Sequence, residues 1–192
     1  RHFEGKGSTS SDGGPPLVRT RTHIRGLPSV PPKHRRELSQ ANAIVARLAA
    51  ILMAAFTAGT QFIVENPADR GDSAFPRRYL DAEHGPLWEM PEIQALRKLS
   101  SKLATFPMCA FNAPWQKYTS LLYSSGYDEW LDPLDRLECS HSSHSQLAGG
   151  TVGPDAIGGG PMALASKLRP VLSAGRLPLG VAIYTLIMAA RP

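Results

Sequence analysis

A helical repeat of apolar residues, followed by a glycine and a short apolar strand, most constrains this fold. Apolar residues recur at three-four spacing over residues 38–56, which predicts one long amphipathic helix. They are Leu38, Ala41, Ile44, Val45, Leu48, Ile51, Leu52, Ala55 and Phe56. Gly59 is expected to end this helix in a left-handed conformation. Residues 61–65 then predict a buried, parallel strand.

Helix, glycine and buried strand in this order make half of an α/β unit. We therefore expect an α/β fold with a partial Rossmann-like sheet, flanked by helices and joined by long loops. The 17 glycines and 17 prolines among 192 residues support long loops, since the usual combined share is about 12%. Further elements are expected as helices over 92–103, 161–173 and 181–190, strands over 105–109 and 119–123, and helix or turn over 127–137. Pro107 places its strand at a sheet edge or bulge.

The positive charge of the chain is concentrated at the N-terminus. The formal net charge is +5, yet residues 1–47 alone carry +6 and the remainder carries −1. We expect a basic Gly/Ser/Pro-rich arm over 1–33, an α/β domain over 34–150 and a helical tail over 151–192. A basic arm attracts phosphate backbones through counterion release, whereas the simpler interpretation is a solvated, disordered arm.

Composition excludes several classes of protein. Two cysteines, Cys109 and Cys139, cannot build a disulfide framework. No apolar N-terminal signal is visible, and the apolar stretch over 179–190 is shorter than the ~20 residues of a membrane span. No Gly-rich phosphate loop follows a strand, which argues against a nucleotide-hydrolysing enzyme. We expect an intracellular protein, nuclear or cytoplasmic, without membrane contact.

The strand over 61–65 ends in Glu65, Asn66 and Pro67, which we consider candidate catalytic residues. Ligand sites of open α/β sheets lie at the carboxyl ends of strands. A carboxyl there can accept a proton from a ring amine, or donate one if burial raises its pKa. The alternative is that Glu65 and Asn66 only cap the next turn. In the long polar loop that follows, Asp69 and Arg70 are candidates for substrate binding.

Two later segments also carry chemically useful side chains. Trp115 and Lys117 are candidates for contacting a base and a phosphate, with Thr119 beside them. Equally, Trp115 covers a core edge while Lys117 lies in solvent.

Cys139, His141 and His144 offer three ligands for a tetrahedral zinc ion, and Cys109 offers a fourth. Paired C-x2-C motifs are absent, and a polar loop with chance histidines is the simpler interpretation.

Four segments in this order resemble a known domain: FIVENPADRGD, GPLWEMPEI, MCAFNAPWQKYTSLLYSS and CSHSSHSQLAGG. They resemble the methyltransferase-like domain of retroelement-type polyproteins from algae and other protists, which is distantly similar to S-adenosylmethionine-dependent cytosine methyltransferases. The resemblance covers roughly residues 14–150. It implies that Glu65 binds the amidine edge of a target base, that Asn66 shapes the site, and that Gln116, Lys117 and Thr119 form a polar basic motif. It also implies S-adenosylmethionine as cofactor of the full-length domain and nucleic acid, DNA rather than RNA, as partner.

The sequence departs from the cytosine enzymes in two respects. Those enzymes carry a nucleophilic cysteine after a proline, upstream of the Glu-Asn motif, and no cysteine precedes Glu65. The Gly-rich turn that binds the methyl donor is also missing. We therefore expect the C-terminal half of a base methyltransferase-like domain, inactive alone. The alternative is a non-catalytic nucleic-acid-binding or structural remnant of a mobile-element polyprotein. An upstream Pro-Cys and Gly-rich turn in a full-length transcript would favour the first.

This chain alone is expected neither to bind S-adenosylmethionine nor to transfer its methyl group. Attack on a cytosine ring carbon needs a thiolate, and transfer needs a donor held in place. Isothermal titration with S-adenosylmethionine should therefore show no binding, and a radiolabel assay on DNA and RNA no transfer. Tight donor binding, or transfer that Glu65→Ala abolishes, would show that the site is complete.

Overall fold

The computed structural model describes residues 17–79, 81–113, 117–144 and 182–185, and these residues form two compact units. The first unit holds the described residues within 17–57 and 68–99, and the second holds those within 58–67 and 100–185. Helices and strands are mixed along the chain, so the broad α/β expectation is confirmed.

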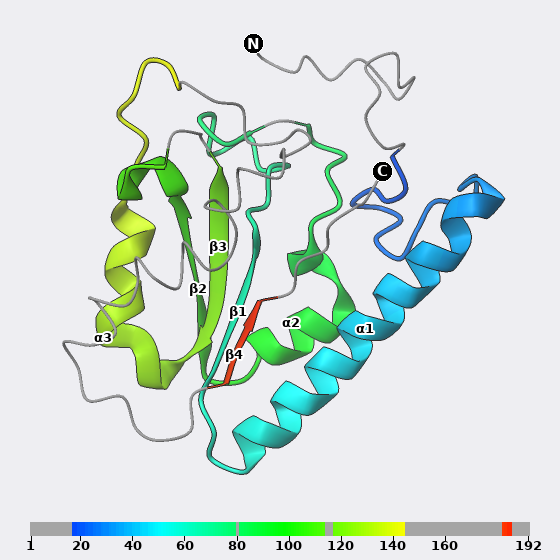
Figure 1. Cartoon of the computed structure of the whole chain (residues 1–192), viewed down its shortest axis with the longest axis horizontal. Coiled ribbons are helices and arrows are strands. Elements are labelled where there is room, and N and C mark those ends of the chain that lie inside the picture. Colours follow the sequence, from blue (N-terminus) through cyan, green and yellow to red (C-terminus); the bar gives the residue numbers. More distant parts are fainter. Residues whose placement is uncertain (1–16, 80, 114–116, 145–181, 186–192) are drawn as a thin grey trace, which may run out of the picture. The chain divides into compact units, whose positions relative to one another are not determined.

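The second unit is built on a mixed sheet whose four described strands lie in the order β2-β3-β1-β4 (Figure 1). The strands are β1 (Phe62–Pro67), β2 (Ser101–Pro107), β3 (Tyr118–Ser124) and β4 (Ala182–Thr185). β3 pairs antiparallel with both β1 and β2, whereas β4 runs parallel to β1. β1 is thus buried, as predicted, but the expected parallel pairing holds only toward β4, since its other neighbour β3 is antiparallel. β2 lies at the edge of the described sheet, where Pro107 is tolerated.

One face of this sheet carries an apolar core. Side chains alternate between the two faces of a strand, and residues from one face of β1, β2 and β3 join this core. Its buried members are Ile63, Ala104, Phe106, Leu121, Tyr123, Tyr127, Leu131 and Leu134. The last three come from the segment after β3, which contains α3 (Asp128–Leu131) and the 3-10 turn Asp132–Arg136. Pro133 lies in that turn, as the prediction of interrupted helix over 127–137 requires.

The first unit is built around α1 (Pro32–Thr57), which packs against the shorter α2 (Pro91–Arg97; Figure 1). Val45, Leu48, Ala49 and Leu52 of α1 are buried. Ile44 and Ile51 share the predicted apolar stripe but are 50% and 52% exposed. Among the described helices, only α1 has the length and apolar content to cross a membrane, a property that core helices of soluble proteins share.

Residues 17–31 differ from the solvated arm expected over 1–33. Val30 is buried, and Thr20 forms an isolated β-bridge with His84. The arginines of this segment contact residues of their own unit. Arg19 donates to Asn42 Oδ1 at 2.7 Å, Arg21 to Asp69 Oδ2 at 2.6 Å and Arg25 to Glu92 Oε1 at 2.7 Å. The composition showed the positive charges of these arginines but not their acidic partners, because Asp69 and Glu92 lie far from them in sequence.

Two predicted helices differ in the structure: one is shorter than predicted, and part of the other is a strand. The helix expected over 92–103 stops at Arg97, because residues 101–103 belong to β2. Within the helix expected over 181–190, residues 182–185 instead form β4 beside β1. A short apolar run fits both the helical and the strand periodicity, and pairing with a neighbouring strand decides between helix and strand. The helix expected over 161–173 lies outside the described residues.

Gly59 provides a test of backbone conformation alone. Its φ is +83°, as predicted for a left-handed residue, and an added Cβ would meet no heavy atom within 4 Å. Gly59→Ala should therefore lower the free energy of unfolding by about 1–2 kcal/mol, through the left-handed conformation. Gly59→Asn should cost less, because asparagine tolerates this region. Urea denaturation measures both, and an alanine variant as stable as the parent would contradict the expectation.

Candidate functional site

Glu65 lies near the carboxyl end of β1, on the face that carries the apolar core. It is opposite Leu121 of β3 in the strand register, and its side chain is only 12% exposed. Burial raises the pKa of Glu65, while the positive charge of Lys117 acts in the opposite direction. The carboxyl group therefore holds its proton more readily than it would in water.

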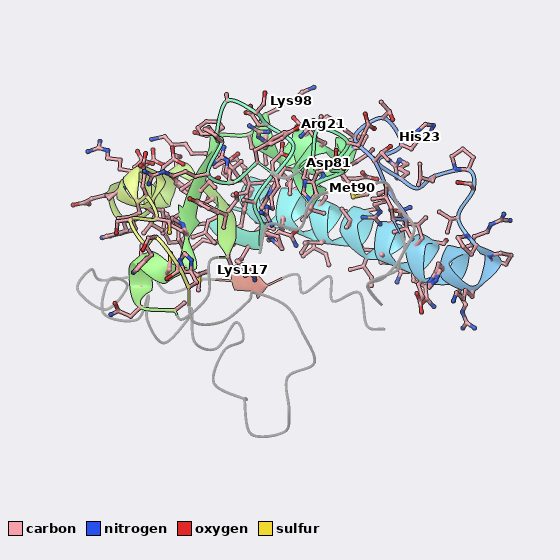
Figure 2. The ribbon with its side chains drawn as sticks, turned by 90° about the horizontal axis from the view of Figure 1, so that it is seen from above. Arg21, His23, Asp81, Met90, Lys98 and Lys117 are labelled. Atoms are coloured by element: carbon pink, nitrogen blue, oxygen red, sulfur yellow. The ribbon has the colours of Figure 1, made fainter. Side chains whose placement is uncertain are left out.

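Glu65, Lys117 and Thr119 form a polar group at this end of the β1–β3 pair. Lys117, which is labelled in Figure 2, immediately precedes β3. Its Nζ lies 3.8 Å from Glu65 Oε1. Thr119 lies opposite Pro67 in the register and is fully buried. Its hydroxyl has no hydrogen-bond partner within the part of the chain that the structure describes. A buried hydroxyl of this kind retains the capacity to bond a ligand.

Asn66 does not join this polar group. Successive residues of a strand point to opposite faces, so Asn66 points away from the face of Glu65. Asn66 is buried, and it lies opposite Ser120, which is also buried. Of the three catalytic candidates, Glu65 and Pro67 thus share a face of β1 and Asn66 lies on the other. Trp115 lies outside the described residues.

Asp69 and Arg70, the candidates for substrate binding, both form hydrogen bonds within the first unit. Asp69 accepts hydrogen bonds from Arg21 Nη2 and, at 2.8 Å, from the Gly71 N–H. Figure 2 labels Arg21, which reaches this loop from the N-terminal segment. Arg70 donates from Nε to the Arg78 carbonyl at 3.0 Å. Sequence alone gave no signal that Arg21 is the partner of Asp69.

Opposing effects set the pKa values of two side chains in this loop, Asp69 and His84. Burial alone would raise the pKa of Asp69, but hydrogen bonds from Arg21 and Gly71 and the nearby positive charge outweigh it, so this pKa is lowered. Burial lowers the pKa of His84, with Asp69 acting against it. Nδ1 of His84 accepts the Arg70 N–H at 3.2 Å. Nδ1 of His84 also lies 3.6 Å from Asp69 Oδ1, and this contact becomes an ion pair only when the ring is protonated, which burial disfavours.

A second group of reactive side chains gathers elsewhere in the second unit. Cys109 lies in the 3-10 turn Met108–Phe111 directly after β2, whereas Cys139, His141 and His144 follow the turn Asp132–Arg136. One ligand atom from each of the four residues lies within 4.8 Å of all the others. Both cysteines are buried, and neither forms a disulfide. These are the four residues that the sequence offered as zinc ligands, and the fold brings them together.

The Cys109 thiol lies in surroundings that favour its neutral form. Burial raises the pKa of Cys109 to about 11, and the hydrogen bond and charge of Cys139 act in the same direction. A thiol with this pKa keeps its proton at neutral pH unless a cation replaces it.

Comparison with protein-family models, with curated proteins and with solved structures found no match for this chain. The side-chain geometry must therefore carry any functional argument. It assembles two groups in the second unit: a shielded carboxyl beside a lysine, and a cluster of two thiols and two imidazoles.

Removing the Asp69 carboxylate is expected to affect stability, because Asp69 binds Arg21 and Gly71. Asp69→Asn should lower the free energy of unfolding by about 1–3 kcal/mol at pH 7. A carboxyl whose pKa is lowered on folding stabilises above its unfolded pKa, near 3.9, and this contribution is lost as the pH falls through the folded value. The difference between variant and parent should therefore shrink below about pH 4.

Urea denaturation between pH 7 and pH 3 measures this effect. Glu83→Gln is the matched control, because Glu83 is exposed in the same loop and its removal should change little. An Asp69→Asn variant of unchanged stability would contradict the structural role.

Proposed function

We propose that this chain is the target-base half of a nucleic-acid base methyltransferase-like domain. It binds nucleic acid and holds a base against Glu65, and it does not transfer a methyl group by itself. The observation that carries this proposal is the shielded Glu65 carboxyl at the end of β1, beside Lys117. In this proposal the α/β sheet is part of a Rossmann-like fold, whose ligands bind at the carboxyl ends of strands.

A carboxyl with a raised pKa suits the amidine edge of a base. When it is protonated, one oxygen donates to the unprotonated ring nitrogen, and the other accepts from the exocyclic amine. Cytosine and adenine both present this pair of groups, whereas thymine presents a ring N–H and a carbonyl. The direction of the Glu65 pKa shift supports this pairing. The proposed substrate class is therefore an unpaired cytosine or adenine.

The neighbours of Glu65 suit the rest of a nucleotide. Lys117 is 43% exposed, so its ammonium group reaches solvent while it lies near Glu65. From this position it can bind the phosphate of the nucleotide whose base contacts Glu65. The Thr119 hydroxyl, unpaired among the described residues, supplies a further polar contact at the same end of the sheet.

Non-catalytic binding of nucleic acid is the second candidate function, and one surface favours it. Lys33, Arg35 and Arg36 are exposed in the first turns of α1, and the first turn contains no acid. The positive end of the helix dipole adds to their charge. Such a surface binds phosphate without reading bases, and its affinity falls steeply with salt.

Single-stranded oligonucleotides of cytosine, adenine or thymine distinguish the two candidates. Fluorescence anisotropy should show tighter binding of the cytosine and adenine strands. Glu65→Leu should weaken these two by about 5- to 150-fold, because a good bidentate base contact contributes about 1–3 kcal/mol. Glu65→Gln should retain part of the preference, since an amide both donates and accepts.

Glu129→Leu is the matched control, because Glu129 is an exposed acid on α3 of the same unit. Equal binding of all three strands, unchanged by Glu65→Leu but lost in a Lys33→Ala, Arg36→Ala double variant, would replace the first candidate by the second. Failure of the chain to bind any strand at low salt would contradict both.

A further inference from the structure

The cluster of Cys109, Cys139, His141 and His144 contributes no residue to the proposed base site, so it needs a separate explanation. Two of its members are buried sulfurs, and all four ligand atoms lie within 4.8 Å of one another. The cluster joins two parts of the chain that are 30 residues apart at Cys109 and Cys139. Residues 137–144 form no helix or strand, yet this segment holds Cys139 inside.

We propose that these four residues form a structural zinc site. Zinc binds thiolate sulfur at about 2.3 Å and imidazole nitrogen at about 2.0–2.1 Å. In a tetrahedron, these bond lengths separate neighbouring ligand atoms by about 3.3–3.8 Å. The Cys139 sulfur lies 3.8 Å from His141 Nδ1 and 3.4 Å from His144 Nε2. Two edges of the tetrahedron therefore already have about this length. The ligand atoms that lie farthest apart, at up to 4.8 Å, must approach each other by about 1 Å.

The donor set selects the metal. Two thiols and two imidazoles suit zinc, whereas calcium and magnesium require oxygen ligands. Four protein ligands leave no open position for substrate, which is the arrangement of structural zinc sites. On binding, Zn²⁺ forms two bonds to sulfur and two to nitrogen, and the two thiols release two protons to solvent. The resulting complex carries no net charge, which suits its buried sulfurs.

The place of the site in the fold indicates what it stabilises. Cys109 follows Met108, whose N–H donates to the Lys117 carbonyl at 2.8 Å. Zinc therefore ties the irregular segment after the turn Asp132–Arg136 to the turn that ends β2. The site is a cross-link within the second unit and does not depend on what Glu65 binds.

Metal analysis of the purified full chain tests this proposal. After incubation with excess zinc and gel filtration, the parent should retain about one zinc ion per chain. Cobalt should replace zinc and give the visible absorption of tetrahedral thiolate coordination. Cys139→Ser and His144→Asn should each weaken binding more than ~10-fold, since even outer-shell changes cost 10–100-fold. His141→Cys should still bind, because cysteine remains a zinc ligand.

Ser142→Ala is the matched control, because Ser142 is an exposed non-ligand in the same loop. Thermal melting covers the case in which a ligand variant folds poorly. A chelator should lower the melting temperature of the parent and leave that of Cys139→Ser unchanged. Failure of the reduced parent to retain zinc, or equal zinc in the parent and both ligand variants, would overturn the proposal. So would a chelator that affects parent and Cys139→Ser alike.

Discussion

The antiparallel pairing of β1 with β3 is the interaction on which the second unit depends. Its register places Ile63 opposite Tyr123, Glu65 opposite Leu121 and Pro67 opposite Thr119. A slip of one residue would move each of these side chains to the other face. The apolar core and the shielded position of Glu65 therefore have the same origin. The pairing also brings Lys117, at the start of β3, to the end of β1, where its charge opposes the effect of burial on the Glu65 pKa.

In the first unit, ion pairs hold together segments that are far apart in sequence, as strand pairing does in the second unit. Arg21 bonds to Asp69, and Arg25 bonds to Glu92, so the segment before α1 is held to later parts of the same unit. Pairs at this level of exposure contribute modestly to stability, but they determine which charges remain available. The arginines that bind their own unit are less available to a phosphate backbone. Lys33 and Arg36, which are exposed at the start of α1, keep that capacity.

The sequence indicates individual candidate side chains but not which of them share a face or a partner. Glu65 was selected as a candidate because ligand sites follow buried strands, and it lies near the end of β1. Asn66 was grouped with it by adjacency, but strand alternation places neighbours on opposite faces. Asp69 was selected for its place in a polar loop, and its partner Arg21 lies 48 residues earlier. No local pattern reports a contact over that separation.

The sequence by itself determined the elements whose signals are local. Periodicity predicted the body of α1, Gly59 its left-handed end, and the apolar run of residues 61–65 most of β1. Only the tertiary structure decided that residues 182–185 pair with β1 as a strand, and that Cys109 meets Cys139 and the two histidines. The physical reason is that helix propensity and glycine conformation act within a few residues. Strand pairing and side-chain clusters instead depend on contacts between distant segments, which exist only once the chain has folded.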